Sequence, residues 1–186
     1  GYGESDRPAD ADYSTAAHVR RFAAFVDDRS FDRVVPVGLS LGGAVALGYT
    51  LDSPDRVRRL VLVDSHGLGA PVPGGRLTYL LSRTDLPNKA ALALLARSRA
   101  ATKASLGNVV TDPDRLDPSV VDAVYDLVRR NHAGRPFRRW RRHEVTWNGY
   151  RTDFSDRLDE VEVPVLLVHG ERDDVVPVAV ARRAAD

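Results

Sequence analysis

The chain has 186 residues, 43% of them hydrophobic, and a formal net charge of +1 from 27 basic and 26 acidic side chains. This composition is typical of a globular domain with an inserted subdomain, and the balanced charge argues against recruitment of nucleic acid or of a membrane surface. Cysteine is absent, which excludes disulfides, thiolate metal sites and a thiol nucleophile. No apolar run is long enough for a transmembrane helix, and we expect a cytoplasmic protein.

The first regular element follows a turn-rich opening loop, Gly1 to Pro8. The stretch from Ser14 to Asp28 has the spacing of an amphipathic helix, with Ser14 as its N-cap. The helix contains His18. A single histidine in a helix is usually a surface or packing residue, so we do not interpret His18 as a ligand.

A nucleophile elbow is predicted next. Apolar residues from Val34 lead into Gly38-Leu39-Ser40-Leu41-Gly42, and a helical pattern continues to about Leu51. Strand, Gly-x-Ser-x-Gly and helix in this order describe a strained turn that exposes the serine hydroxyl. We expect a positive φ at Ser40, and glycines at Gly38 and Gly42 because side chains there would collide with neighbouring backbone.

Two details qualify the elbow. The Leu41 N–H is expected to be one donor of an oxyanion hole, because it begins a helix directly after the serine. Pro36 lies inside the apolar run and cannot donate to a strand ladder, so we interpret it as a fault at the start of the strand. The alternative reading of Gly-x-Ser-x-Gly is an ordinary flexible loop.

The fold class follows from the next elements. After a turn at Pro54 to Val57, the continuous apolar run Arg59 to Asp64 predicts a strand covered on both faces. Strand, helix and strand at this spacing form a βαβ unit. We therefore predict an α/β fold with a doubly wound, mostly parallel sheet.

Residues 71–153 carry no strand-like run and predict an inserted helical cap between two parts of the core, 1–70 and 154–186. One helix is expected from Pro87 to Leu106. A second begins at Asp117-Pro118 and is expected to end at Gly134. A third would present one apolar stripe of Phe137, Trp140 and Trp147.

Seven arginines lie close together in this block: Arg129, Arg130, Arg135, Arg138, Arg139, Arg141 and Arg142. Arginines around an aromatic residue are one signature of nucleic-acid binding. We favour a solvated helix face, given the balanced total charge. A third possibility is that one arginine holds an anionic group of a substrate.

The strand pattern returns in Val163 to Gly170, followed by Glu171-Arg172-Asp173-Asp174 and a last helix near Pro177. A carboxylate just past a parallel strand faces the same edge of the sheet as the elbow. Such an acid can orient the histidine of a catalytic triad. Asp173 and Asp174 both fit, and Asp174 also suits a helix cap.

These motifs resemble the α/β-hydrolase superfamily over nearly the whole chain. Gly38 to Gly43 matches its nucleophile elbow, which implies Ser40 as the nucleophile. His169-Gly170-Glu171-Arg172-Asp173 with Pro177 matches its acid motif, whose spacing selects Asp173. Asp64 to Gly69 and the cap spacing are most similar to esterases and to carbon–carbon bond hydrolases.

The resemblance places the upstream oxyanion loop and the catalytic histidine outside the chain, which therefore looks like a fragment lacking both ends. The histidines are His18, His66, His132, His143 and His169, and none follows Asp173. We interpret His169 as structural, and His66 as a residue that could line the pocket.

The expected function is a serine hydrolase acting on an ester or related carbonyl substrate with an apolar part, through Ser40, Asp173 and an outside histidine. The alternatives are carbon–carbon bond hydrolysis, a haloperoxidase-like reaction, or a binding protein with an idle triad. No metal or cofactor is implied, and the oligomeric state is left open.

Overall fold

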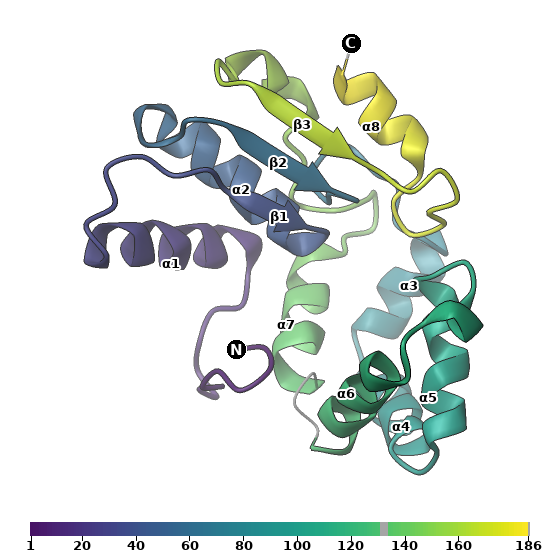
Figure 1. Cartoon of the computed structure of the whole chain (residues 1–186). Coiled ribbons are helices and arrows are strands. Elements are labelled where there is room, and N and C mark those ends of the chain that lie inside the picture. The colour runs from purple at the N-terminus through teal and green to yellow at the C-terminus, as the bar shows by residue number, and fades with distance from the viewer. Residues whose placement is uncertain (131–133, 186) are drawn as a thin grey trace.

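A parallel sheet forms the centre of the computed structural model, which describes residues 1–130 and 134–185. Three strands, β1 (Val37–Leu39), β2 (Leu60–Val63) and β3 (Val165–Val168), lie in the order β1-β2-β3. Gly38 pairs with Leu62, and Leu62 pairs with Leu167. The predicted α/β class with a parallel sheet is confirmed (Figure 1).

Helix α2 (Leu41–Asp52) is packed between the sheet and helix α1 (Thr15–Asp28) (Figure 1). Its side chains are small or apolar all round, as expected for a helix that is buried on both sides. Leu47 belongs to a core shared with the sheet and with α8 (Val178–Ala185), whereas Tyr49 packs against α1. The predicted helix cap is present, because the Ser14 Oγ accepts a hydrogen bond from the Ala17 N–H at 3.1 Å.

Strand β1 is shorter than the apolar run that predicted it. Val34 forms only an isolated bridge with Val57, and Pro36 lies before the first strand residue. The Pro36 carbonyl accepts a hydrogen bond from the Val61 N–H at 2.9 Å. Pro36 therefore bonds to the sheet through its carbonyl oxygen alone. The N–H group that proline lacks is not needed for a hydrogen bond between β1 and β2.

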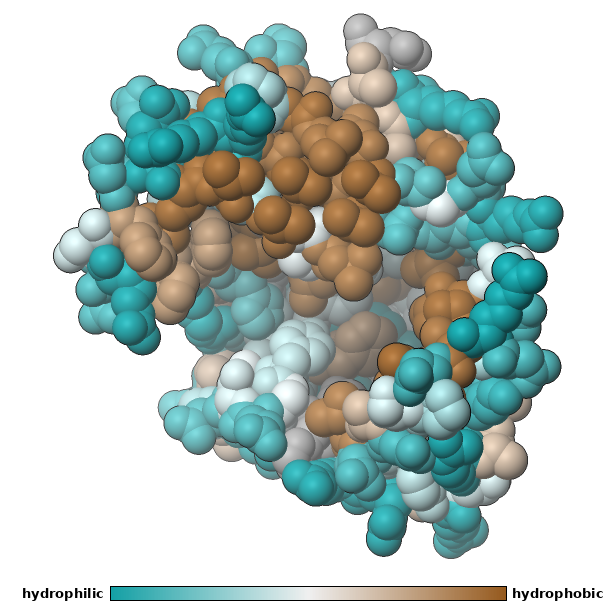
Figure 2. Space-filling model, viewed as in Figure 1, coloured by the Kyte–Doolittle hydropathy of each residue, from teal (hydrophilic) through white to brown (hydrophobic). Residues whose placement is uncertain are grey.

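One face of the sheet is bare in the described part of the chain. Leu60 and Leu62 are buried on the side of α2, but Val37 is 68% and Leu39 is 63% exposed on the other side. This bare face is made of Val37, Leu39, Val61, Val63, Leu166 and Val168. Figure 2 shows it as a broad hydrophobic area. The expectation that the strand at Arg59 to Asp64 is covered on both faces is wrong for the described residues, because Val61 and Val63 are only half-buried.

The block between residues 71 and 153 is helical, with one isolated bridge between Val145 and Tyr150. Its α-helices are α3 (Gly75–Ser82), α4 (Leu86–Leu95), α5 (Arg99–Ser105), α6 (Pro118–Arg129) and α7 (Gly134–Glu144). The 3₁₀ turns of the chain are η1 (Pro54–Arg56), η2 (Leu106–Asn108), η3 (Pro113–Arg115) and η4 (Ser155–Glu160). Helices α3 to α6 lie on the side toward which the strand arrows point (Figure 1).

The helix boundaries correct three predictions. Helix α3 was not anticipated. The single helix from Pro87 to Leu106 is wrong, because the Ser98 Oγ accepts a hydrogen bond from the Ala101 N–H at 3.2 Å and starts α5. Asp117 caps α6 as predicted, but α6 ends at Arg129 and Gly134 begins α7. His132 lies outside the described residues.

The expected apolar stripe of α7 is only partly present. Trp140 is buried, whereas Phe137 is exposed and Trp147 follows the end of the helix. Several arginines also make specific contacts. Arg142 pairs with Asp85 at 3.0 Å, and Arg138 lies 3.6 Å from the same carboxylate. These contacts tie α7 to the start of α4, so the arginines are more than a solvated face.

A buried carboxylate joins α7 to α1. Glu144 is 1% exposed and accepts hydrogen bonds from the Thr15 hydroxyl at 2.9 Å and the Thr152 N–H at 3.0 Å. The Trp140 indole N–H donates to the same hydroxyl at 3.1 Å. Burial by itself would raise the pKa of Glu144, but the hydrogen bonds from Thr152 and Thr15 outweigh burial and lower it.

Glu144→Gln should destabilise the protein by about 1–3 kcal/mol. The carboxylate accepts hydrogen bonds at both oxygens, whereas the glutamine amide has one oxygen acceptor and an NH2 group in place of the other. The lowered pKa means that the charge of Glu144 stabilises the fold above its ordinary pKa, and that this stability is lost as the pH falls through the folded pKa. Urea unfolding of Glu144→Gln from pH 7 to pH 3 should therefore show a weaker loss on acidification than the wild type. Glu160→Gln, at an exposed ion pair, is the control. An equal acid response in both variants would contradict this role.

Candidate active site

Ser40 occupies the turn between β1 and α2 with backbone angles φ 52° and ψ −118°. A non-glycine residue at positive φ is strained by about 1–3 kcal/mol, so neighbouring contacts must hold it. The Ser40 N–H donates to the Val63 carbonyl at 2.9 Å, and the Ser40 carbonyl accepts from the N–H groups of Gly43 at 2.9 Å and His66 at 3.1 Å. The predicted positive φ is confirmed.

Close packing around the turn explains two of its glycines. A Cβ on Gly38 would lie 2.6 Å from the Gly43 Cα, and a Cβ on Gly43 would lie 2.7 Å from the Ser65 Cβ. Gly42 differs, since no described atom beyond its neighbouring residues and its own helix backbone lies within 4 Å of the position of its Cβ. The prediction that Gly42 prevents a collision is therefore wrong, and Gly43 is the second glycine that packing requires.

The surroundings of Ser40 suit a reactive hydroxyl. Ser40 is exposed, and Leu41 is the first residue of the 12-residue helix α2. In the described part of the chain, the Leu41 N–H and the Ser40 hydroxyl both lack a hydrogen-bond partner. The N–H and the positive end of the helix dipole can therefore stabilise negative charge that develops beside Ser40.

Ser40 opens onto a cavity of about 530 Å³ between β1, α1 and α2. Apolar residues line most of it: Phe22 and Val45 from the two helices, and Val37 and Leu39 from the open edge of β1. His18 also lines it, although its sequence position indicated only a surface or packing role. No signal in the sequence links His18 to Ser40, because the two residues meet only when α1 packs beside α2.

His66 does not line this cavity. Its side chain is 4% exposed and packs edge-on against Tyr150, with ring centroids 4.3 Å apart, and against Trp140 at 5.6 Å. Burial lowers the pKa of His66, although Glu144 and Asp153 partly oppose the shift. His66 contributes to the elbow through its backbone N–H, and the possibility that its side chain lines the pocket is not met in the cavity beside Ser40.

Asp173 is held in a closed turn after β3. Its Oδ1 accepts hydrogen bonds from the N–H groups of Val175 at 2.8 Å and Val176 at 2.9 Å. The Asp173 N–H donates to the Gly170 carbonyl at 3.2 Å. These bonds fix the carboxylate while its Oδ2 has no hydrogen bond within the described residues.

Asp64, at the end of β2, supports the same turn. Its Oδ1 accepts a hydrogen bond from the Gly170 N–H at 2.8 Å, and its backbone has a φ of 44°. The His169 Nε2 lies opposite the Val176 carbonyl at 2.6 Å, which assigns its proton to that nitrogen. The structural role expected for His169 is therefore supported. Asp64 was missed as a site residue, although a carboxylate after a parallel strand is a recognisable signal.

Asp64, His169 and Asp173 are the described residues that come nearest to a metal-binding arrangement. One ligand atom from each lies within 4.8 Å of the others. The His169 nitrogen, however, already contacts the Val176 carbonyl, and the carboxylates already accept backbone hydrogen bonds. The cluster therefore holds the turn from Gly170 to Val176 that carries Asp173, which we call the acid turn.

Asp174 does not cap the backbone. The Val176 N–H, which lies two residues after Asp174, donates to Asp173 instead, and Asp174 is exposed without a hydrogen bond in the described part of the chain. The interpretation of Asp174 as a capping residue is wrong. Asp173 and Asp64 open onto a cavity of about 700 Å³ that residues 107–111 also line.

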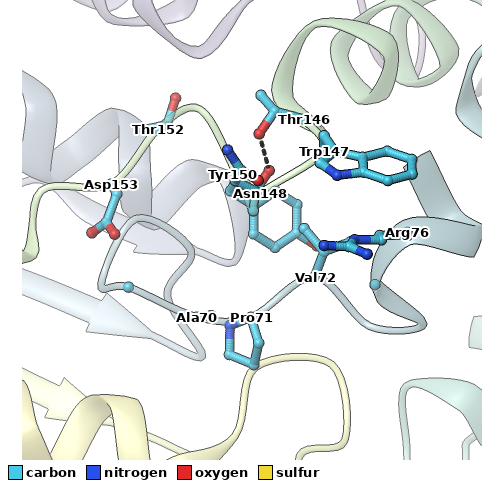
Figure 3. Close-up of a pocket in the computed structure, with 13 residues that line it drawn as sticks. Ala70, Pro71, Val72, Arg76, Thr146, Trp147, Asn148, Tyr150, Thr152 and Asp153 are labelled. Atoms are coloured by element: carbon cyan, nitrogen blue, oxygen red, sulfur yellow. Dashed lines mark hydrogen bonds between the residues drawn. The ribbon is translucent and has the colours of Figure 1, made fainter.

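A further cavity of about 420 Å³ lies between residues 69–76 and 146–153 (Figure 3). Trp147 and Arg76 lie at one end, with the guanidinium 4.8 Å from the ring centre, and Asp153 lies at the other. The Thr146 hydroxyl donates to the Gly149 carbonyl at 2.8 Å and shapes the turn between them. Tyr150 separates this cavity from the buried ring of His66.

Ser40 and Asp173 thus follow β1 and β3 at the same edge of the sheet, with β2 between them. The structure brings Asp173 together with Asp64 and His169, and Ser40 together with His18. It does not place a described histidine in hydrogen-bonding contact with the Ser40 hydroxyl.

Comparison with known proteins identifies the family. The pattern that defines the alpha/beta hydrolase fold matches residues 1–186, so the chain belongs to the α/β-hydrolase family. The serine turn and the acid turn lie at the positions that the resemblance in the sequence implied. No helix in the described ranges 1–130 and 134–185 has the length and apolar character needed to cross a membrane.

The relatives are hydrolases or uncharacterized proteins. A protein of Mycobacterium tuberculosis named only as uncharacterized is 32% identical over 195 residues, covering 99% of this chain and 54% of that protein. A 2-hydroxy-6-oxononadienedioate/2-hydroxy-6-oxononatrienedioate hydrolase of Cupriavidus pinatubonensis is 27% identical over 189 residues, covering 98% and 61%. The solved structure of Est816, an N-acyl homoserine lactone degrading enzyme, is 28% identical with a TM-score of 0.71, covering 100% and 66%. The chain therefore spans 54% to 66% of the length of these proteins.

Gly43→Ala should destabilise the protein by about 1–3 kcal/mol, because the new methyl group would overlap Ser65. Gly42→Ala should leave stability unchanged or raise it by up to about 1 kcal/mol, since its methyl group enters open space in a helix. Both residues lie in the first turn of α2, so each is a control for the other. Urea denaturation measures the difference, and equal losses would show that the contact with Ser65 is unimportant.

Proposed function

We propose that the protein is a serine hydrolase in which Ser40 attacks the carbonyl carbon of an ester or related substrate. The observation that carries this proposal is the strained, exposed Ser40 at the N-terminus of α2. Backbone strain of this kind persists only where packing enforces it, and it is typical of functional sites. The match to the α/β-hydrolase family supports the same role.

In the proposed reaction, a histidine from outside residues 1–186 takes the Ser40 proton as the Oγ–carbon bond forms. The Leu41 N–H stabilises the resulting oxyanion. The imidazolium then returns the proton to the leaving oxygen, and water releases the acyl group by the same two steps in reverse.

Asp173 is the acid that orients this histidine. The support is its geometry: Oδ1 is occupied by two backbone N–H groups, and Oδ2 is left for an imidazole. Asp64 acts on Asp173 indirectly, since it holds the Gly170 N–H at the start of the turn. Asp64 is therefore a positioning residue in this proposal.

Residues 71–153 form the cap in this proposal, and the cap selects the substrate without taking part in the chemistry. Its segment 107–111 shares a cavity with Asp173, and Trp147 shares a different cavity with the core loop at 69–72. The apolar wall beside Ser40 favours a small-molecule substrate with an apolar part.

Hydrolysis of a carbon–carbon bond next to a ketone is the second candidate. It is supported by the similarity to the dienedioate/trienedioate hydrolase, at 27% identity over 98% of this chain and 61% of that protein. The same serine and the same acid turn would serve both reactions, so substrate trials with the complete protein distinguish them.

Ser40 should be the hyper-reactive serine of the complete protein. A fluorophosphonate probe is expected to form one adduct, located at Ser40 by mass spectrometry of peptides. Ser40→Ala should abolish labelling and hydrolysis of p-nitrophenyl esters together, because both need the same hydroxyl. Labelling that persists in Ser40→Ala would refute the assignment of the nucleophile.

Asp173→Asn should lower kcat in the complete protein by about three to four orders of magnitude, because the amide would favour the wrong imidazole tautomer. The turn should still fold, since the asparagine Oδ1 can accept the hydrogen bonds from Val175 and Val176. Asp174→Asn is the matched control and should retain most of the activity, because its side chain has no such contacts. The assignment fails if Asp174→Asn is the variant that loses activity.

A further inference from the structure

The balanced total charge of the chain conceals an unequal distribution. Residues 71–153 contain 15 basic and 8 acidic side chains, which gives this helical block a net charge of +7. The remaining residues contain 12 basic and 18 acidic side chains, a net charge of −6, and the two parts together give the total of +1. The helical block is therefore strongly basic, and it attracts anionic surfaces although the whole chain is nearly neutral.

Helix α4 turns an apolar face to solvent at the end of this block that lies farthest from the sheet (Figure 1). Leu86 is 76% and Leu94 is 63% exposed, and Ala90 and Ala93 between them are exposed as well. Positions separated by four, seven and eight residues lie on one side of a helix. These four residues therefore form one exposed apolar stripe along α4.

A basic cavity lies beside the apolar stripe of α4. It has a volume of about 320 Å³ and is lined by Lys89, Leu92, Ala93, Ala96, Val128, Arg129 and Arg138. Ala93 belongs both to the stripe and to the cavity wall. The cations come from three helices, with Lys89 in α4, Arg129 in α6 and Arg138 in α7. The cavity thus combines an apolar wall with three positive charges next to the stripe.

The positive charge at the cavity is poorly compensated. Lys89 and Arg129 have no carboxylate partner in the described part of the chain. Arg138 lies 3.6 Å from the carboxylate of Asp85, but Arg142 contacts the same carboxylate at 3.0 Å. One negative charge is therefore shared between two arginines, and the other two cations remain available to an anion.

The acidic side chains of the neighbouring helix α6 do not remove this excess. Asp122 pairs with Arg99, and Asp126 lies 3.9 Å from Arg130. Because these carboxylates are engaged by other arginines, the surroundings of the cavity stay positive.

We propose that the end of residues 71–153 farthest from the sheet binds the surface of a membrane rich in anionic lipids. The apolar stripe of α4 enters the boundary between headgroups and acyl chains. Lys89, Arg129 and Arg138 contact lipid phosphates at the basic cavity. Burial of apolar area and attraction to anionic headgroups act together in interfacial binding of this kind.

The combination of the two features selects lipid as the occupant. A nucleic acid would engage the cations, but it would leave the exposed leucines Leu86 and Leu94 in water. A lipid surface uses both the charge and the stripe. This binding is independent of the proposed hydrolysis, because it involves neither Ser40 nor Asp173.

The test is sedimentation of the complete protein with vesicles of phosphatidylcholine, or of an equal mixture of phosphatidylcholine and phosphatidylglycerol. The wild type should bind the anionic vesicles at least about tenfold more strongly than the neutral ones, because several basic side chains lie near the surface. Raising the salt concentration should weaken this binding, since mobile ions screen the attraction.

Two double variants separate the charge from the stripe. Lys89→Glu with Arg129→Glu should lower binding to anionic vesicles by about thirtyfold or more, because each basic side chain contributes about fivefold. Leu86→Ser with Leu94→Ser should lower it by about tenfold, since α4 then has little apolar area to insert. Thermal melting of each variant reports whether the protein is folded.

Arg58→Glu with Arg59→Glu is the matched control. It changes the net charge by the same amount as the Lys89 and Arg129 variant. Both arginines are exposed, and they precede β2 at the end of the sheet opposite to the helical block. This control should bind anionic vesicles within about twofold of the wild type, because its charges lie away from the lipid surface.

Three outcomes would overturn the proposal. The first is absent binding, or equal binding of the wild type to neutral and anionic vesicles. The second is an equal loss in the Arg58 and Arg59 control, which would make the attraction a property of total charge. The third is unchanged binding after the two leucines are replaced by serine. If a DNA duplex then displaces the vesicles, the surface is a nucleic-acid site.

Discussion

The strained backbone of Ser40 is the constraint on which the rest of the structure depends. A residue at positive φ stays there only if its neighbours hold it, and here they come from three separate segments. Strand β2 accepts the Ser40 N–H through Val63, the loop after it donates through His66, and α2 approaches Ser65 closely enough to require Gly43. The buried, small-residue surface of α2 permits this approach, so the helix that follows Ser40 also helps to fix the turn.

Hydrogen bonds from neighbouring segments also hold the turn that carries Asp173. Backbone N–H groups occupy one oxygen of Asp173, and Asp64 holds the Gly170 N–H from the neighbouring strand. A carboxylate fixed in this way loses little conformational freedom when an imidazole docks on its other oxygen, which is the benefit of preorganisation. In the helical block between residues 71 and 153, Glu144 has a comparable role, since its buried charge joins α7 to the first turn of α1.

Local sequence patterns predicted most helices and strands, but few of the residues at which they begin and end. The helix from Thr15 and the helix at Pro118 were recognised from spacing and caps, because those signals act within one turn of the chain. Helix α3 and the break at Ser98 were missed, because a short helix has little periodicity and a serine cap resembles any surface serine. The run from Arg59 to Asp64 was predicted as covered on both faces, yet Val61 and Val63 are only half-buried, because apolar composition does not reveal which surface finds a partner.

The sequence by itself determined the turn that carries Ser40, the helix that follows it, and the strand that leads into the Asp173 turn. These features depend on residues a few positions apart, whose φ, size and hydrogen bonds are local properties. Only the tertiary structure decided which side chains surround them. Packing of α1 beside α2 placed His18 with Ser40, strand order placed Asp64 at the acid turn, and the approach of α2 to Ser65 made Gly43 necessary instead of Gly42. Contacts between distant segments depend on how whole elements pack, and no short pattern encodes that arrangement.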